Sequence, residues 1–417
     1  AALTPPEDEV IYTDDVIRPF DLERDLKDVD LVGISVDSKT ASRAYQIAEA
    51  YRRRGVKVVL GGIHVSLLPD EARRHADAIV VGFAEQTWPQ LLRDWKCGRL
   101  RAVYEHGGAA CVDGLPRPRR DLQKALGYAM PRTVNATRGC RQVCDFCVAP
   151  AVPLGWSTRP VGEVVDDIRS LDGGTFAFHD LNLTDDVAYA KELFAAIRPL
   201  KKAWGGLVST KVARDPELLD LMRESGCSYL LIGFESVSPS ALTGMRKGFN
   251  APDHYRDVVD ALHERHIVVQ GCFIFGLDDD TPEVFDLTVA AIDELRIDIP
   301  RFALYTPFPN TLAYHRLKAE KRLLHESWRY YDTQHVVIKP KQMSPEELDS
   351  GFIRAWRESF KLGVAAKRLR FHRNTRISAV GNLAYRLYGH RLKTDVDRFP
   401  QEPGVTAAWR QQPVDPV

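Results

Sequence analysis

The chain alternates short apolar runs with helical patterns, and this alternation constrains its fold more than any other feature. In the N-terminal part, apolar runs lie at 30–36, 57–62 and 78–82, and helical patterns lie at 41–54, 69–75 and 86–96. Short apolar strands separated by helices are typical of a parallel sheet that is covered on both faces. The sequence therefore predicts an α/β fold.

A second series of the same kind follows residues 112–131, whose Pro, Gly and Arg content indicates a linker. Strands are expected at Thr133–Gly139, Thr175–Asn182, Trp204–Val212, Tyr229–Ser236, Val268–Gly276 and Arg301–Phe308. Helical patterns fill the gaps at Gly162–Leu171, Val187–Leu200, Pro216–Glu224, Pro252–Arg265 and Thr281–Leu295. Six such units suit a partial (β/α)6 barrel better than an eight-fold one, and ligands would bind at the C-terminal ends of its strands.

We expect three domains. Residues 1–125 form a Rossmann-like domain, 126–328 the partial barrel, and 329–417 a mainly helical C-terminal extension. A doubly wound domain usually begins with a central strand, whereas this chain opens at Ala1 without one. We therefore expect the first domain to be incomplete at its N-terminus.

Charge balance and cysteine content restrict the class of protein. The chain has 57 Lys and Arg and 57 Asp and Glu, so no overall field favours nucleic acid or an acidic partner. No apolar run approaches the roughly 18 residues that span a bilayer, and no signal-peptide pattern is present. Seven cysteines are an odd number, which argues against a disulfide framework. We expect a cytoplasmic protein with reduced thiols.

Three of the cysteines, Cys140, Cys144 and Cys147, lie within eight residues, directly after the first strand of the second series. Three thiolates at this spacing can wrap one corner of a cuboidal iron–sulfur cluster. Such clusters usually take four cysteines, so one iron is left open for another ligand. A structural zinc site needs four ligands, typically in two separated pairs, and this motif does not supply them.

The CxxxCxxC loop, with Phe146 before its third cysteine, resembles that of the radical S-adenosylmethionine (SAM) enzymes. Further matches occur in order at strand ends, at Asp180–Asn182, Ser209–Lys211, Gly233–Ser236 and Thr306–Thr311. Two positions depart from the family pattern. Leu181, preceded by His179, replaces the second Asp of an Asp-Asp-Asn element, and Asn310 replaces a turn glycine. Neither departure touches the cysteines.

The resemblance implies that Cys140, Cys144 and Cys147 hold a [4Fe–4S] cluster. It also implies that SAM is bound by residues at the strand ends, namely Phe146, Asp180, Asn182, Ser209, Lys211 and Glu235. Alternate residues of a strand share a face, so Asp180 can act with Asn182, and Ser209 with Lys211. The alternative for Glu235 is a solvated or helix-capping carboxylate.

The first series resembles the cobalamin-binding Rossmann-like domain of cobalamin-dependent radical SAM enzymes. The resemblance implies cobalamin contacts at the strand ends, namely Ser35, Val36, Ser38, Gly61, Gly62, His64, Gly82 and Glu85. Glycines there would let a large planar ligand approach the backbone. Cobalt ligation by His64 is disfavoured, because the Asp-x-His-x-x-Gly motif of other cobalamin folds is absent. A corrin-edge contact and a structural histidine both remain open.

The resemblance implies an enzyme that transfers a methyl group from methylcobalamin to an unactivated carbon, by way of a 5′-deoxyadenosyl radical. A cobalamin-dependent cyclase or rearrangement enzyme is the alternative, since it shares every motif. A corrinoid carrier without catalysis would not need the cysteine loop. A tRNA methylthiotransferase would need a second upstream three-cysteine cluster, whereas only Cys97 and Cys111 precede the motif. The segments 323–328 and 343–348 are similar to the post-barrel extension of a subgroup that includes hopanoid lipid methylases.

Between residues 360 and 394 there are nine Lys and Arg and no Asp or Glu, interleaved with Leu, Phe and Tyr. The ordinary interpretation is a solvated face or a domain cover. The alternative is a helix that lies on anionic lipid, as a peripheral membrane contact. The expected partners are a small-molecule or lipid substrate and a flavodoxin- or ferredoxin-type electron donor, without nucleic acid.

Overall fold

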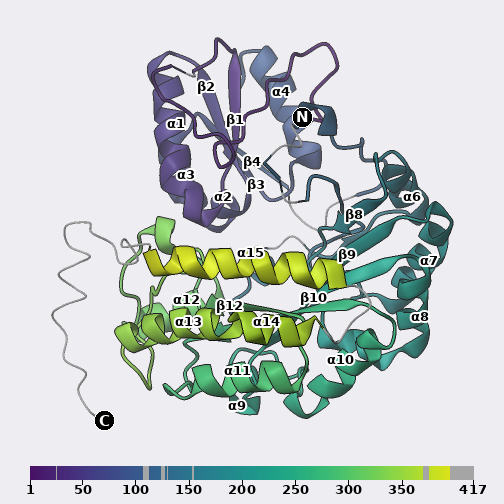
Figure 1. Ribbon diagram of the computed structural model, residues 1–417. Coiled ribbons are helices and arrows are strands. Elements are labelled where there is room, and N and C mark those ends of the chain that lie inside the picture. Colours follow the sequence, from purple (N-terminus) through teal and green to yellow (C-terminus); the bar gives the residue numbers. More distant parts are fainter. Residues whose placement is uncertain are drawn as a thin grey trace.

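The computed structural model of the chain describes residues 1–24, 26–106, 112–123, 127–128, 130–152, 155–369 and 375–394. It contains two parallel sheets, each with its own helices, and further helices from the C-terminal part of the chain (Figure 1). The predicted α/β class is confirmed.

The first sheet has the strand order β1-β2-β3-β4, and all neighbouring strands are parallel. The strands are β1 (Leu31–Ser35), β2 (Lys57–Gly61), β3 (Ala78–Val81) and β4 (Val103–Glu105). The connecting helices are α1 (Ala41–Arg53), α2 (Ile63–Leu67), α3 (Pro69–Ala72) and α4 (Ala84–Lys96). Both faces are covered, because Val58 and Leu60 pack with α1 and α3, while Val59 and Val80 pack with α4. The sequence did not predict β4.

The second sheet has the order β12-β11-β10-β9-β8-β5, and its two edge strands are not paired with each other. It is therefore a partial barrel, as predicted. Its strands are β5 (Thr133–Val134), β8 (Thr175–Phe178), β9 (Ala203–Val208), β10 (Cys227–Glu235), β11 (Val268–Phe275) and β12 (Ile299–Leu304). Its outer helices are α6 (Val161–Arg169), α7 (Val187–Ile197), α8 (Pro216–Glu224), α10 (Tyr255–His263) and α11 (Val284–Glu294).

The predicted strand Thr133–Gly139 is wrong in its second half. The chain leaves the sheet after β5, and β6 (Thr137–Arg138) pairs antiparallel with β7 (Ser157–Thr158). The cause is the buried carboxylate of Asp180, which accepts the backbone N–H groups of Ala136 and Thr137 in place of a sheet partner. This departure turns the chain toward the cysteine loop.

Shorter elements complete the structure. Further α-helices are α5 (Val148–Ala151), α9 (Pro239–Gly244) and α12 (Leu312–Ala319). Short 3₁₀ helices lie at Ser38–Thr40, Arg73–His75, Arg120–Leu122, Arg198–Leu200, Thr210–Arg214, Pro252–His254 and Trp328–Tyr330.

The C-terminal part is helical, as predicted, in α13 (Pro345–Ser359), α14 (Leu362–Arg368) and α15 (Thr375–Thr394). Helix α13 packs between α11 and α15, and α15 also contacts β12 (Figure 1). The predicted extension also included residues 370–374 and 395–417, which lie outside the described residues. Within the described chain, no helix combines the length and apolarity needed to cross a bilayer.

Candidate functional site

The three motif cysteines lie on one loop between β6 and α5. Cys144 is buried, while Cys140 and Cys147 are partly exposed. The Cys147 N–H donates to the Cys144 carbonyl at 3.2 Å, which closes a tight turn. Burial raises the pKa of the Cys140 thiol to about 12 and that of Cys144 to about 11. Such thiols ionise only where a nearby cation compensates their charge.

This arrangement fits a cuboidal cluster better than a single ion. Within the described residues, no group of three or more His, Cys, Asp and Glu side chains is placed to hold one metal ion. In a [4Fe–4S] cluster each thiolate binds a different iron, so the three sulfurs need not meet at one point. The thiols of Cys140 and Cys144 both interact electrostatically with that of Cys147, so the three lie around one region.

Asp185 anchors one side of the cysteine loop. Its carboxylate accepts the Arg141 N–H at 2.8 Å and the Gln142 Nε2–H at 3.1 Å. It also accepts the side-chain amide of Asn182 at 2.6 Å. The segment after β8 therefore fixes the backbone directly beyond Cys140.

Asp145 anchors the other side. Its backbone N–H donates to the Met245 carbonyl at 3.1 Å, and its own carbonyl accepts from the Ala313 N–H at 3.0 Å. The Tyr305 hydroxyl donates to its carboxylate at 2.8 Å. The loop is thus held from β8, from the end of β12 and from the segments around α9 and α12.

A buried ion pair lies at the end of β10. Lys247 donates to Glu235, and the side chain of each is 10% exposed. Glu235 has a left-handed backbone (φ 66°) at an irregularity in the strand pairing. The pair occupies the space above Gly233, because a Cβ on Gly233 would lie 2.1 Å from the Glu235 Oε1 and 2.7 Å from the Lys247 Nζ. Lys247 also interacts electrostatically with Cys144, which places the pair beside the cysteine loop.

The C-terminal edge of the first sheet carries Gly61, Gly62 and Gly82 and is called the glycine edge. Gly62 (φ 97°) follows β2, and Gly82 (φ 80°) follows β3. A Cβ on Gly62 would lie 2.7 Å from the backbone N of Val36, so no side chain fits there. The Ser66 hydroxyl accepts the Gly82 N–H at 2.9 Å and donates to the Gly62 carbonyl at 3.1 Å, which ties the two loops together.

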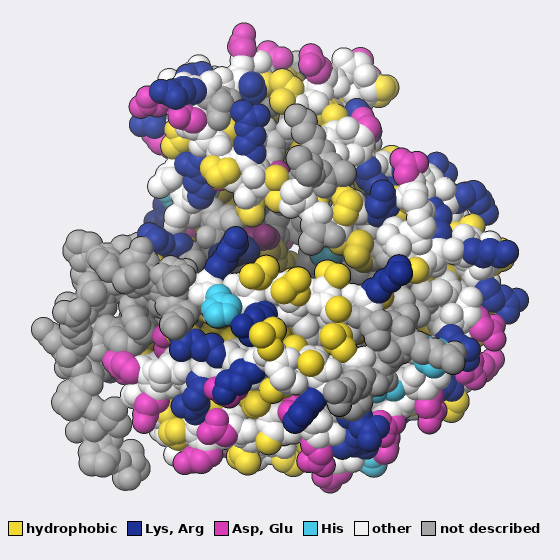
Figure 2. All heavy atoms as spheres, in the orientation of Figure 1, with side chains coloured by type: hydrophobic (Ala, Val, Ile, Leu, Met, Phe, Trp, Pro, Cys, Tyr) yellow, Lys and Arg dark blue, Asp and Glu magenta, His cyan; other side chains and the backbone are white. Residues whose placement is uncertain are grey.

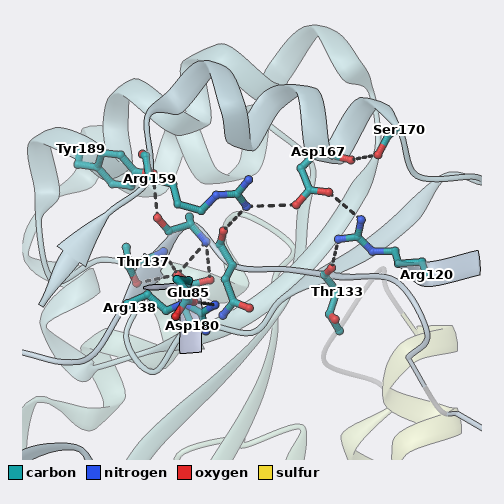
Figure 3. A network of polar contacts seen from close by, with 12 residues as sticks. Glu85, Arg120, Thr133, Thr137, Arg138, Arg159, Asp167, Ser170, Asp180 and Tyr189 are labelled. Atoms are coloured by element: carbon teal, nitrogen blue, oxygen red, sulfur yellow. Dashed lines mark hydrogen bonds and ion pairs between the residues drawn. The ribbon is translucent and has the colours of Figure 1, made fainter. Parts of the chain in front are cut away.

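The glycine edge faces the cysteine loop across the domain junction. The Arg138 Nη2 donates to the Glu85 Oε1 at 3.1 Å, and Arg138 lies two residues before Cys140 (Figure 3). Helix α2, which follows Gly62, contacts α5, which follows Cys147. A ligand on the glycine edge would therefore lie next to the cysteine loop.

Comparisons with known proteins agree with this geometry. The B12 binding domain family matches residues 2–92, and the radical SAM superfamily matches residues 134–292. Bacteriochlorophyllide d C-12(1)-methyltransferase of Chlorobaculum tepidum is 33% identical over 361 residues, which are 84% of this chain and 78% of that protein. The chain belongs to the cobalamin-dependent radical SAM methyltransferases.

Further relatives of this methyltransferase include bacteriochlorophyllide d C-8(2)-methyltransferase of Chlorobaculum tepidum, 28% identical over 92% of this chain and 89% of that protein. The hopanoid C-2 methylase of Rhodopseudomonas palustris is 26% identical over 79% of this chain and 65% of that protein. The fold is similar to that of the radical SAM methyltransferase TsrM from Kitasatospora setae, with a TM-score of 0.61 and 19% identity over 72% of this chain and 68% of that one. The predicted cofactors, a [4Fe–4S] cluster, SAM and cobalamin, are those of the family.

The carboxylate of the predicted SAM residue Asp180 binds the segment between β5 and β6. Its carboxylate accepts from the backbone of Ala136 and Thr137 and, at 2.6 Å, from the Thr137 hydroxyl (Figure 3). Asn182 donates to Asp185 and accepts the Ser209 N–H at 3.2 Å. Both side chains thus hold neighbouring backbone or side chains in place, and their contact with SAM stays a prediction.

The remaining predicted SAM residues border the cysteine loop. Lys211 donates to the Gln142 Oε1 at 3.2 Å and lies 4.4 Å from the centre of the Phe249 ring. The Phe146 ring packs edge-on against Tyr305, with centroids 6.5 Å apart. Lys211 and Glu235 thus lie beside the loop, and Phe146 is part of it. Their roles toward SAM stay predictions.

The predicted cobalamin residues divide into two groups. Ser35 is exposed at the end of β1, beside Gly61, Gly62 and Gly82 on the edge. His64 and Ser38 instead point into the domain. His64 is fully buried, and its ring nitrogens hydrogen-bond to Ser38 and Glu71 at 3.2 Å each. These contacts favour a structural histidine.

Val36 and Glu85 also have partners inside the protein. Val36 is completely buried, and its backbone receives the N–H of His64 at 3.0 Å. Glu85 is the junction partner of Arg138.

Several functional candidates escaped the sequence analysis. Lys247, Asp185 and Arg138 carry no motif of their own, and Asp185 and Arg138 each have a partner more than forty residues away. Asp185 lies three residues beyond the recognised Asn182, which was the available signal. Lys247 follows the recognised Glu235 by twelve residues, in a loop without periodicity.

Proposed function

We propose that the protein methylates an unactivated carbon of an apolar small molecule. When bound, the cluster and SAM supply a 5′-deoxyadenosyl radical, and cobalamin supplies the methyl group. One observation supports this most directly. The cysteine loop lies between the Glu235–Lys247 pair and the glycine edge, so the sites proposed for the cofactors adjoin one another.

We assign the residues as follows. Cys140, Cys144 and Cys147 hold the cluster, and Asp185 fixes their loop. SAM carries an ammonium and a carboxylate at its methionine end, and the Glu235–Lys247 pair offers one group of each opposite charge. The backbone at Gly61, Gly62 and Gly82 supports the corrin.

The named activities of the relatives suggest the substrate class. Two of them act on bacteriochlorophyllide d, and a third on a hopanoid. We propose a polycyclic, largely apolar substrate for this chain. A cyclase is the second candidate, because an anaerobic magnesium-protoporphyrin IX monomethyl ester cyclase of Cereibacter sphaeroides is 27% identical over 72% of this chain.

The reaction itself separates the two candidates. The enzyme, with its cluster reconstituted, is incubated anaerobically with SAM, methylcobalamin, a reductant and bacteriochlorophyllide d. We expect a product that is heavier by one CH2 group, together with 5′-deoxyadenosine. The Cys144→Ala variant should form neither. A product that has lost hydrogen without gaining carbon would instead support the cyclase.

An electron donor must reach the cysteine loop. Val143, between the first two cysteines, is 60% exposed, and the neighbouring Arg141 lies over the Trp156 ring at 3.7 Å. An exposed apolar residue beside a cation suits an acidic donor such as a flavodoxin. We place this reaction in the cytoplasm, where thiols remain reduced. Val143→Glu should slow reduction by flavodoxin but not by dithionite, whereas equal slowing by both reductants would argue against this surface.

Helix α15 presents apolar residues outward. Val380 is 69% exposed, and Leu383 and Leu387 are 60% exposed. Exposed Arg376 and Arg391 flank them on the same face, and Figure 2 shows this apolar patch with basic side chains around it. Since α15 contains no acidic residue, its charge complements an anionic lipid surface. We propose that this face rests on a membrane.

Flotation with vesicles tests this contact. The protein should float with vesicles that contain phosphatidylglycerol, and less with pure phosphatidylcholine. Combined Leu383→Gln and Leu387→Gln should abolish flotation. Leu287→Gln, at an equally exposed leucine on α11, should leave flotation unchanged. Equal loss in both variants would contradict a specific role of α15.

A further inference from the structure

The second sheet has one face that is not covered by the outer helices. Leu230, Ile232 and Phe234 of β10 pack into the main core with those helices. Successive strand residues point to opposite faces, so the residues between them point the other way. On this second face, Tyr229, Leu231 and Gly233 are all partly exposed. The Glu235–Lys247 pair also lies on this face, since it occupies the position of a Gly233 side chain.

The pairing register extends this face to the edge strand. Gly233 pairs with Cys272 of β11, and Cys272 pairs with Arg301 of β12. Neighbouring strands lie about 4.8 Å apart, so the Cα atoms of Arg301 and Gly233 are on the order of 10 Å apart. Most other residues of the face are small or apolar, namely Ala177, Gly205, Leu207, Leu231 and Ala303.

Arg301 is an exposed cation on this face. Among the residues that the structure describes, no hydrogen bond or ion pair engages its guanidinium. Two buried arginines, Arg159 of the barrel and Arg368 of α14, differ from it, since they pair with Asp167 and Asp293. Arg301 instead interacts electrostatically with Cys272 and with the phenols of Tyr229 and Tyr385. Burial raises the pKa of each of these groups, which keeps them neutral.

The two phenols that interact with the guanidinium are linked to each other through Gln270. Tyr229 donates to Gln270, and the Gln270 Nε2 donates to the Tyr385 hydroxyl at 2.8 Å. Tyr385 comes from α15, whose Asn382 donates to the Asp298 carbonyl next to β12 at 2.9 Å. Helix α15 therefore brings a hydroxyl to the same end of the sheet as Arg301.

We propose that Arg301 binds a carboxylate group of the substrate. This inference rests on the proposed function and names the substrate class more closely, as an apolar molecule with one anionic group. A monoanion is matched by one guanidinium with neutral hydroxyls around it, whereas a phosphate dianion would call for more than one cation. An anion held at Arg301 leaves a span of about 10 Å along the apolar face to the Glu235–Lys247 pair. The reacting carbon would lie toward that pair.

Binding of matched probes tests this site. Pyrenebutyrate is a fluorescent apolar carboxylate, and its methyl ester has the same body without the charge. Affinity of both is measured by fluorescence on the reconstituted enzyme with SAM and cobalamin. The wild-type enzyme should prefer the acid by roughly tenfold or more, because a charge-assisted hydrogen bond contributes to its binding alone. Arg301→Gln should remove that preference and leave ester affinity within about twofold.

The controls separate this inference from the proposed function. Arg223→Gln removes the same charge from the exposed surface of α8 and should leave both affinities unchanged. The iron content and visible absorbance of Arg301→Gln should match those of the wild-type enzyme, which reports an intact cluster site. Equal affinity of the wild-type enzyme for acid and ester would overturn the role of Arg301, even if the variant failed to fold. Absence of SAM cleavage in the wild-type enzyme would instead refute the proposed function.

Discussion

Arg138 and Glu85 join the two domains, with the Arg138 Nη2 3.1 Å from the Glu85 Oε1. Arg138 lies two residues before Cys140. Glu85 lies in the first turn of α4, at the glycine edge. The contact therefore links the proposed cobalamin support to the proposed cluster loop.

Glu85→Gln should reduce methylated product per molecule of 5′-deoxyadenosine, because the two cofactor supports would no longer be held in register. The ion pair is partly exposed, so the free energy of unfolding should fall by less than about 1 kcal/mol. Product ratios by mass spectrometry and urea unfolding measure the two effects. Asp121→Asn, which breaks an exposed ion pair with Arg119, is the control. An unchanged product ratio would leave the contact a purely structural one.

Ala substitution of Cys140, Cys144 or Cys147 should abolish the visible absorbance of the cluster and the cleavage of SAM. Cys227→Ala should keep both, because Cys227 is buried at the start of β10, away from the loop. Absorption spectra and iron content after anaerobic reconstitution are the measurements. A full four-iron cluster in all three loop variants would exclude the assignment.

Glu235→Ala should weaken SAM binding by roughly tenfold to a hundredfold, as expected for the loss of one charge-assisted hydrogen bond. It should also destabilise the fold, by about 3 kcal/mol or more, because Lys247 would be left buried without its partner. A combined Glu235→Gln and Lys247→Met variant should recover part of the stability but not the SAM affinity. Calorimetric SAM binding and urea unfolding distinguish these outcomes. Recovery of SAM binding in the double variant would make the pair structural only.

The lowered pKa of the Glu71 carboxyl predicts that acid destabilises the fold at the domain junction. Burial would raise its pKa, but hydrogen bonds from His64, Trp328 and Tyr45 outweigh burial and lower it to about 2. A lowered folded-state pKa stabilises the fold above the unfolded-state pKa, and this stability is lost as pH falls from about 4.5 toward about 2.

The Glu71→Gln variant measures this contribution. It should be less stable than the wild-type protein at neutral pH, and the difference should narrow as the pH falls through that window. Urea unfolding from neutral pH downward follows the change. A stability difference that is constant over this range would show that the Glu71 charge contributes nothing.

The sequence predicted the parts of this structure that local pattern determines. Apolar runs located every strand of the second sheet, since a buried parallel strand needs continuous apolar residues. The spacing of Cys140, Cys144 and Cys147 predicted the cluster loop for a similar reason, because one short segment supplies all three ligands.

What the sequence left open depends on contacts between distant segments. The break between β5 and β6 arises because Asp180, over forty residues away, takes the backbone N–H groups of the missing strand. The roles proposed for Lys247 and Arg301 could not be predicted from the sequence for a similar reason, since they depend on the neighbours that the folded sheet places beside these residues. A lysine or arginine in an irregular or edge position carries no such information by itself.

The hydrogen bond from Trp328 to Glu71 is a second contact that joins the two domains. Trp328 follows the last barrel strand in sequence, and its indole N–H donates to the Glu71 Oε2 at 3.0 Å, inside the first domain. Trp328 and Arg138 therefore contact the first domain from opposite ends of the barrel sequence. A motion about the linker that opens the junction would have to break both of these contacts. The two contacts therefore help to set the separation between the proposed methyl donor and the proposed radical source.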